Sequence, residues 1–428
     1  MMSVTIDERS NWKRPFFIIW IGQAFSIVGS ILVQFALVWW LTRETGSATV
    51  LATATIFSML PGIFIGPFSG ALVDRWNRKT IMLVADSLIA LMTAGLVLVF
   101  WMGQAQVWHV LVVMLVRALG GTFHFPAMQA STSLMVPEKH LSRVAGLNQA
   151  LNGVLNIAAP PLGAFLMSLL PIYQVLAIDI VTAAIAVGTL AFIHIPQPKR
   201  RPEGVLTPQA LWGDVREGFR YLAHWPGMLI LLGMATLVNL LMSPAFSLMP
   251  LMITRVFKGE AMHLGVMNSA EGLGVILGGL ALSVWGGFKR KVHTSMAGLV
   301  GMGLGVILLG SAPAQMFGVA LLGIGIAGFM NPITNGPLFA LLQAKIAPEM
   351  QGRVFNLVGA LASAASPLGL MLAAPVADYL GIRFWFWIAG VSCLVMAGVA
   401  LSIPAVVHLE DVSGAPRSEG RSALAVQD

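Results

Sequence analysis

Charged side chains are scarce in this chain. Only 10% of its 428 residues are Asp, Glu, Lys or Arg, and 57% are hydrophobic, whereas a soluble domain carries about 25% charged residues. A single soluble core cannot bury so much apolar chain, so the composition excludes an ordinary soluble protein. Cysteine is almost absent as well, because Cys393 stands alone. An internal disulfide is therefore excluded.

What the sequence does contain is a series of long apolar runs. Each run has roughly 18 or more residues, which is enough to cross a ~30 Å hydrocarbon core at 1.5 Å per residue. The runs predict an all-α membrane protein with twelve transmembrane helices, at about 15–41, 47–73, 80–102, 108–136, 143–170, 173–195, 227–254, 262–286, 292–311, 315–344, 353–380 and 383–406.

The net charge of +7 is distributed unevenly along these spans. With the N-terminus inside, twenty Lys and Arg residues fall on the cytoplasmic side and one, Arg117, lies within a span. Four lie outside, namely Arg43, Arg255, Lys258 and Arg383. This asymmetry follows the positive-inside rule and predicts that both termini are cytoplasmic. The basic excess therefore reports topology, and we expect no nucleic-acid partner.

The two halves of the chain echo one another. Pro137-Glu138 after the fourth span matches Pro348-Glu349 after the tenth, and AAPPLG at 158–163 matches AASPLG at 364–369. Two parallel six-helix bundles with a substrate path between them are the architecture of major facilitator transporters. The expected organisation is an N-terminal bundle, a cytoplasmic linker, a C-terminal bundle and a cytoplasmic polar tail, at 1–195, 196–225, 226–406 and 407–428.

The loop between the second and third spans resembles the signature loop of the major facilitator superfamily. It contains a glycine, an acid and three cations: Gly70, Asp74, Arg75, Arg78 and Lys79. The glycine permits close helix approach, and the acid sits at a helix end from which it can pair across the two halves. Such a charge latch predicts a gating loop. The alternative is that the cations only determine topology.

Four ionisable side chains lie inside predicted spans: Asp86, Arg117, Asp179 and Glu271. An unpaired charge there costs at least ~2.5 kcal/mol, so each needs a partner or a function. The acids are candidate proton carriers. Arg117 matches the fourth-span arginine of the superfamily's proton-coupled exporters, a resemblance that implies proton coupling. The alternatives are that Arg117 and Asp179 stabilise helix packing and that Asp86 supports the latch.

Polar side chains recur on single helix faces of several spans. Spacings of three and four residues place them along one side of each helix, and a lipid-facing position would leave their amides unsatisfied. They are therefore candidates for the substrate path, although contacts between helices alone would explain them too. The set comprises Gln23, Ser26, Ser30, Gln34, Gln149, Asn152, Asn156, Asn268, Asn331 and Asn335.

Several motifs resemble the drug-exporter branch that contains the bacterial macrolide-efflux proteins. They include WIGQA at 20–24, LTRETGSA at 41–48, FHFPA at 123–127 and GRVF at 352–355. The fifth-helix glycine-proline signature of antiporters is only partly present, as APPLG at 159–163. The resemblance implies a location in the bacterial plasma membrane and an export activity.

Together these features predict a secondary active exporter of amphipathic organic compounds, macrolide-like drugs first, working as a proton antiporter by alternating access. Trp39, Phe246, Met249 and Met330 are candidates for an adaptable apolar pocket. Alternatives are the export of an endogenous metabolite such as a siderophore, and a membrane sensor or assembly partner that transports nothing. We expect no enzyme activity, no cofactor and no metal, because no nucleophile–base pair, metal spacing or phosphate-binding loop occurs. The expected partners are a small molecule, protons and the lipid bilayer, for a monomeric chain.

Overall fold

The computed structural model describes residues 12–195, 216, 219–220, 225–346 and 348–411. The described backbone is helical and contains no β-strand. The helices of the first half are α1 (Lys13–Thr45), α2 (Ala48–Phe64), α3 (Gly66–Arg75), α4 (Arg78–Trp101), α5 (Val107–Met135), α6 (Glu138–Leu169) and α7 (Ile172–Phe192). Those of the second half are α9 (Pro226–Ser247), α10 (Met249–Leu251), η1 (Met252–Val256), α11 (Ala261–Trp285), α12 (Lys291–Ser311), α13 (Phe317–Lys345), α14 (Pro348–Leu380), α15 (Ile382–Ser402) and α16 (Pro404–Val407).

Eleven of the described helices are long and apolar enough to cross a membrane. The remaining crossing is made by α2, with 17 residues, followed directly by α3. Only Ile65 separates the two, and Pro67 opens α3. Proline has no N–H, so it is tolerated in a first turn and interrupts a continuing helix. The predicted all-α fold with twelve membrane spans is thereby confirmed.

The seventh predicted span, 227–254, is also interrupted. Helix α9 ends at Ser247, Leu248 intervenes, and Pro250 lies in the first turn of α10. The turns after it form a π-helix, η1. The break lies close to the end of the span that carries Arg255.

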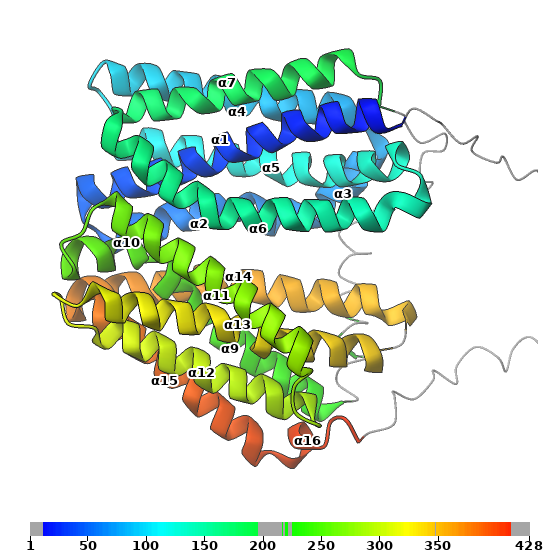
Figure 1. Ribbon diagram of the computed structural model, residues 1–428, viewed down its shortest axis with the longest axis vertical. Helices are drawn as coiled ribbons and strands as arrows, with labels where there is room; N and C mark the ends of the chain where they lie inside the picture. The colour runs from blue at the N-terminus through cyan, green and yellow to red at the C-terminus, as the bar shows by residue number, and fades with distance from the viewer. Residues whose placement is uncertain (1–11, 196–215, 217–218, 221–224, 347, 412–428) are drawn as a thin grey trace, which may run out of the picture.

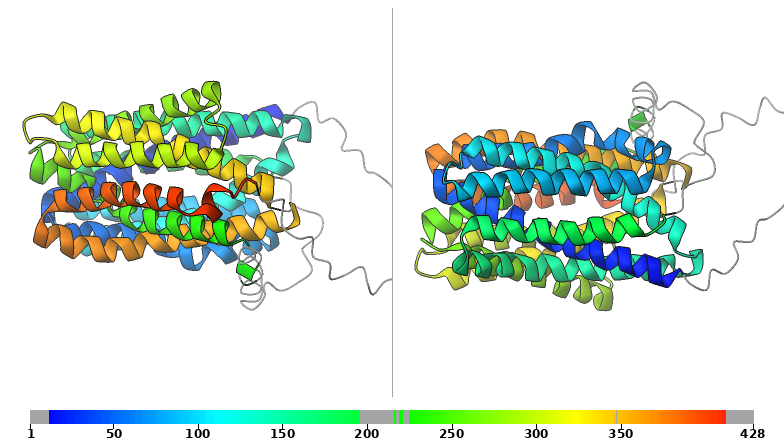
Figure 2. Two further views of the ribbon diagram at one scale, coloured as in Figure 1. Left: turned by 90° about the horizontal axis from the view of Figure 1, so that it is seen from below. Right: turned by 90° about the horizontal axis from the view of Figure 1, so that it is seen from above.

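The helices form two bundles that lie side by side. Figure 1 shows α1 to α7 as one group and α9 to α16 as the other. The long helices run in similar directions in Figure 1 and in both views of Figure 2. The bundles touch chiefly through two helix pairs, α6 with α11 and α2 with α14.

The contact between α6 and α11 is unusually close at Gly265. A Cβ atom added there would lie 2.8 Å from the Cα atom of Pro161, so only glycine fits without a shift of the backbone. One turn further along α11, the Ser269 hydroxyl donates a hydrogen bond of 2.7 Å to the carbonyl oxygen of Ile157. The two halves are therefore in backbone contact along this pair.

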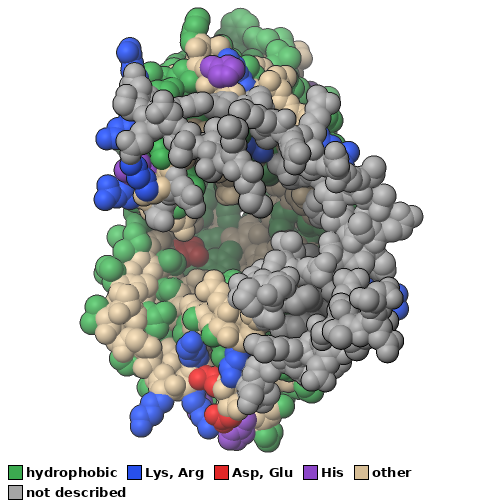
Figure 3. Space-filling model, turned by 90° about the vertical axis from the view of Figure 1, so that its right-hand side faces the viewer, with side chains coloured by type: hydrophobic (Ala, Val, Ile, Leu, Met, Phe, Trp, Pro, Cys, Tyr) green, Lys and Arg blue, Asp and Glu red, His purple; other side chains and the backbone are tan. Residues whose placement is uncertain are grey.

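The two ends of the bundle differ. The beginning of α1 and the short helix α16 lie at one end, and the face at this end carries Lys and Arg side chains around a hollow between the bundles (Figure 3). At the opposite end, the beginning of α2 touches the end of α14. The protein is thus open on one face and joined across the halves on the other.

Candidate functional site

The first cluster of embedded polar groups lies inside the N-terminal bundle, around Asp179. Its carboxylate accepts hydrogen bonds from Arg117 at 2.5 Å, from Thr93 at 3.2 Å and from Ser30 at 3.4 Å. Both charged side chains are buried, with 9% of Arg117 and 1% of Asp179 exposed. The pair joins α5 to α7, while Ser30 and Thr93 add α1 and α4. The charge of Arg117 is therefore compensated within its own bundle.

A second cluster, around Asp86, lies in the same bundle. Gln23 of α1 donates a hydrogen bond of 3.1 Å to Asp86 Oδ2. His124 Nε2 of α5 lies 3.3 Å from Asp86 Oδ1, although it lacks the alignment of a hydrogen bond. The carboxylate is buried. The histidine of the FHFPA motif is thus the neighbour of an embedded acid.

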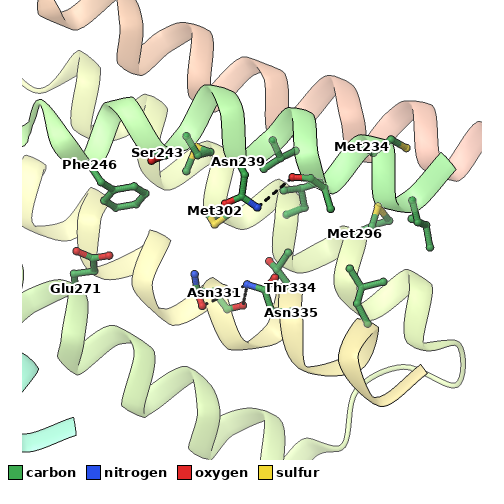
Figure 4. Close-up of a pocket in the computed structure, with 16 residues that line it drawn as sticks. Met234, Asn239, Ser243, Phe246, Glu271, Met296, Met302, Asn331, Thr334 and Asn335 are labelled. Carbon is green, nitrogen blue, oxygen red and sulfur yellow. Dashed lines mark hydrogen bonds between the residues drawn. The ribbon is translucent and has the colours of Figure 1, made fainter. Parts of the chain in front are cut away.

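A cavity of about 350 Å³, which we call the main cavity, lies within the C-terminal bundle. It is lined by α9, α11, α12 and α13, and it contains Glu271 together with Asn331 and Asn335 (Figure 4). Its apolar walls are rich in methionine. Within the described part of the chain, the Glu271 carboxylate has no hydrogen-bond or ion-pair partner, and no Lys, Arg or His lines the cavity.

A smaller cavity of about 260 Å³ lies between the two bundles. Gln34 and Thr55 line it from the first half, and Asn268 and Met249 from the second. Phe246 lines both cavities. The ring of this residue therefore separates a chamber inside one bundle from the space between the halves.

At the closed end, Asp378 of α14 binds the start of α2. Its carboxylate accepts hydrogen bonds from the backbone N–H groups of Ala48 (3.1 Å) and Thr49 (3.2 Å) and from the Thr49 hydroxyl (3.1 Å). Arg255 of η1 donates to the same carboxylate at 2.9 Å and to the carbonyl oxygen of Gly46. We call Gly46, Ala48, Thr49, Arg255 and Asp378 the outer cluster. It ties the two halves together.

At the open end, two cations of the predicted gating loop contact their own bundle. Arg78 donates a hydrogen bond of 2.9 Å to the carbonyl oxygen of Ala130 near the end of α5. Lys79 donates one of 2.8 Å to the carbonyl oxygen of Ala191 at the end of α7. Gly70 and Asp74 lie in helix α3, but the contacts of these two residues are outside the described part of the structure.

The corresponding loop of the second half, at 286–291, contains three cations and no acid. Carboxylates from the segment after α16 lie beside it. The Arg290 guanidinium lies 3.1 Å from the Asp411 carboxylate. At the beginning of α12, the backbone N–H of Val292 donates a hydrogen bond of 3.0 Å to the Glu410 carboxylate. The side chain of His408 also binds Asp411 at 2.8 Å, and this contact lowers the pKa of the Asp411 carboxyl from its ordinary value. The second loop therefore has acidic partners that are distant in the sequence.

Residues 19–355 match the family model of the Major Facilitator Superfamily. The chain belongs to the major facilitator superfamily. Its fold, its twelve crossings and its cavities are those of a membrane transporter of this superfamily rather than of an enzyme.

Curated relatives within the superfamily are drug exporters. The chain is 35% identical to macrolide efflux protein A of Streptococcus pyogenes, over 95% of this chain and all of that protein. It is 28% identical to the multidrug efflux pump Tap of Mycobacterium tuberculosis, over 94% of this chain and 96% of the pump. The resemblance to macrolide-efflux proteins expected from the motifs is confirmed.

A solved structure with the same fold is that of a bacterial homologue of the human lysosomal transporter Spinster. It superposes with a TM-score of 0.64 at 14% sequence identity, and the alignment covers 94% of this chain and 97% of that one. At this identity the likeness shows the shared superfamily fold alone.

The structure places the predicted site residues in three groups. Arg117, Asp179 and Asp86 lie inside the N-terminal bundle with Gln23 and Ser30, whereas Glu271 lies in the main cavity. Asn331 and Asn335 share the cavity of Glu271, and Gln34 and Asn268 line the space between the halves. Ser26 is buried. The amides of α6, Gln149, Asn152 and Asn156, are exposed and line neither cavity.

The candidates for an apolar pocket are divided in the same way. Phe246 lines both cavities and Met249 the smaller one. Trp39 is buried in the core, and Met330 packs against it.

Sequence reasoning missed Asp378 as a functional candidate. A signal exists, since Asp378 is an acid near the outer end of the eleventh span, and Arg255 is one of the four cations outside the positive-inside pattern. Two opposite charges on the side of the membrane that carries few cations are candidates for pairing. The methionines of the main cavity carry no such signal, because the chain contains 24 of them.

Proposed function

We propose that this protein is a proton-coupled exporter of amphipathic organic compounds, with macrolide-like drugs as its first substrates, in the plasma membrane of a bacterium. The observation that carries the proposal is the main cavity, a methionine-rich chamber inside the membrane with one uncompensated carboxylate, Glu271. The curated relatives support the substrate class, because they are named as macrolide and multidrug efflux proteins.

Alternating access is supported by the difference between the two ends of the bundle. The outer cluster holds the halves together at one end, and the opposite face is hollowed (Figure 3). In this state a substrate reaches the cavities from the hollowed face. Export then requires the outer cluster to separate and the loop of Gly70, Asp74, Arg75, Arg78 and Lys79 to close that face.

Proton coupling is assigned to the embedded ionisable groups, with different weights. Glu271 is the first candidate, because its charge is uncompensated in a low-dielectric region and protonation removes that cost. Arg117 and Asp179 compensate each other, and Asp86 accepts a hydrogen bond from Gln23. They take part through rearrangement of those contacts during the cycle.

Drug accumulation in cells that lack their own exporters tests this function. Cells that express the wild type should accumulate less macrolide than cells with an empty vector, whereas Arg117→Ala and Glu271→Gln should restore accumulation toward the empty-vector level. The amount of each protein in the membrane is measured in parallel. Equal accumulation in expressing and empty cells across a broad drug panel contradicts export, and undiminished export by both variants contradicts the coupling assignment.

A further inference from the structure

The polar groups of the main cavity offer acceptors for a ligand. Asn239 and Asn335 each spend an N–H on a backbone carbonyl, of Ala235 at 3.2 Å and of Asn331 at 3.1 Å. Thr334 spends its hydroxyl proton on the carbonyl of Met330 at 2.9 Å. Their side-chain oxygens retain lone pairs, and an ionised carboxylate only accepts. A ligand that donates hydrogen bonds therefore finds acceptors here, the Glu271 carboxylate among them.

Charge leads to the same conclusion. Arg117 and Asp179 neutralise each other, and Asp86 has His124 beside it, whereas the Glu271 carboxylate meets no cation among the described residues. An isolated charge in the membrane interior costs roughly 2.5 kcal/mol or more. A bound cation removes this cost, so the cavity selects a positively charged group.

Close helix packing fixes the backbone of Glu271. A Cβ atom on Gly328 of α13 would lie 3.1 Å from the Cα atom of Glu271, so the two backbones are in contact. Figure 4 shows the carboxylate directed toward Phe246 of α9, on the opposite wall of the cavity. Because α13 also carries Asn331, Thr334 and Asn335, this contact fixes the backbone of Glu271 relative to the helix that carries the amides.

The remaining walls suit an apolar body of variable shape. They include flexible methionine side chains, which adapt to different ligands, and the ring of Phe246. The methionines are Met234, Met242, Met296 and Met302. The volume of about 350 Å³ holds a small organic molecule or one arm of a larger one. The cavity thus combines one anionic point with an adaptable apolar surface.

We propose that Glu271 is the ammonium-binding residue of this transporter and that its preferred substrates are lipophilic amines in their protonated form. The amine nitrogen binds the Glu271 carboxylate, the amide oxygens in the cavity accept further N–H groups, and the apolar body contacts the methionines. This inference rests on the proposed export function and names the substrate chemistry of its cavity.

Binding of two matched probes to the purified full-length protein tests the inference. Monodansylcadaverine has an apolar fluorescent body and a protonated amine, and its N-acetyl derivative has the same body without charge. The wild type should bind the amine about tenfold or more tightly than the acetyl derivative, the size expected for a charge-assisted hydrogen bond. Glu271→Gln should remove most of this difference and leave the affinity for the acetyl derivative within about twofold.

The control variant is Glu260→Gln, the same change on an exposed carboxylate immediately before the same helix. It should bind both probes as the wild type does. Retained binding of the neutral probe shows that Glu271→Gln is folded. Equal binding of the two probes by the wild type, an unchanged amine affinity in Glu271→Gln, or loss of both probes in that variant overturns the inference.

The failure of this inference is distinguishable from failure of the proposed function. A wild type that exports macrolides from cells but does not prefer the charged probe retains the exporter function and loses the ammonium site. A wild type that exports no compound loses the function itself.

Discussion

At the residue scale, the embedded charges of this protein are of two kinds. Arg117 and Asp179 form a buried pair with hydrogen bonds from Ser30 and Thr93, whereas Glu271 faces a cavity without a partner. A buried pair is expensive to break, because removal of one partner leaves the other charge uncompensated. An uncompensated carboxylate gains free energy from any proton or cation that reaches it. The first kind is suited to holding helices together and the second to binding.

This difference predicts a strong dependence of Asp179 and Arg117 on each other. Asp179→Leu or Arg117→Met alone should lower the free energy of unfolding by roughly 3–5 kcal/mol. The double variant, which removes both charges, should recover most of that loss. Thermal unfolding of the detergent-purified variants measures the effect. A double variant no more stable than either single one contradicts a direct interaction between the two.

The pairing was only partly predictable from the sequence. An arginine inside an apolar span needs a partner for its charge, and Asp179 was one of three embedded acids that could be this partner. Which acid lies opposite depends on the rotation of α5 and α7 about their axes, and a continuous apolar run does not fix that rotation. The same reason explains why Gln23, expected on the substrate path, lies against Asp86 instead.

At the element scale, the outer cluster is a helix cap supplied by the other half of the molecule. The carboxylate of Asp378 satisfies N–H groups at the start of α2, where the helix dipole also favours a negative charge. The side chains of Asp378 and Arg255 are 30% and 38% exposed. Exposed ion pairs contribute only about 0–1 kcal/mol. Contacts this weak are suited to breaking and forming again in each transport cycle.

Loss of the cap should therefore open the outer end. Met102 and Met316 are exposed residues at the outer ends of the two halves. Spin labels attached to the cysteines of a Met102→Cys, Met316→Cys protein report the distance between the halves by double electron–electron resonance. Asp378→Asn should shift the distance distribution toward longer values. The native Cys393 is buried and does not compete for the label.

Glu260→Gln again serves as the control, since Glu260 is an outer carboxylate of α11 for which the described structure shows no contact with the first half. Its distance distribution should match that of the parent protein. Identical distributions for Asp378→Asn and the parent would mean that the cap does not hold the halves together.

The helices themselves were more predictable than their contacts. Apolar run length depends only on composition, and all twelve predicted spans correspond to described helices. The breaks at Ile65 and Leu248 were not predicted, although Pro67 and Pro250 stand just after them. Proline is common inside the spans of this chain, and several, such as Pro126, leave their helix continuous. Local sequence alone does not tell the two cases apart.

At the scale of the whole molecule, the two contacts between the bundles are equivalent by the internal repeat. The fifth span of the first half, α6, touches the second span of the other half, α11, and the fifth span of the second half, α14, touches α2. The echoing segments 158–163 and 364–369 lie in α6 and α14. The sequence shows this repeat because similar segments occur at equivalent positions of both halves.

The cavities break this symmetry. The main chamber and its uncompensated carboxylate lie in the C-terminal bundle, and the compensated clusters lie in the N-terminal bundle. We infer a division of labour in which the second half binds the substrate and the proton carried by Glu271, while the buried contacts of the first half rearrange as the two halves rock.

Transport by the purified protein in liposomes tests this account most directly. With the interior made more acidic than the outside, wild-type protein should concentrate a macrolide inside the vesicles as protons leave, and a protonophore should abolish the accumulation. Glu260→Gln should behave like the wild type, and Glu271→Gln should accumulate no more macrolide than protein-free liposomes, in which the acidic interior alone traps the protonated amine. Macrolide movement that is the same with and without the proton gradient, or the same in Glu271→Gln as in the wild type, would contradict the account.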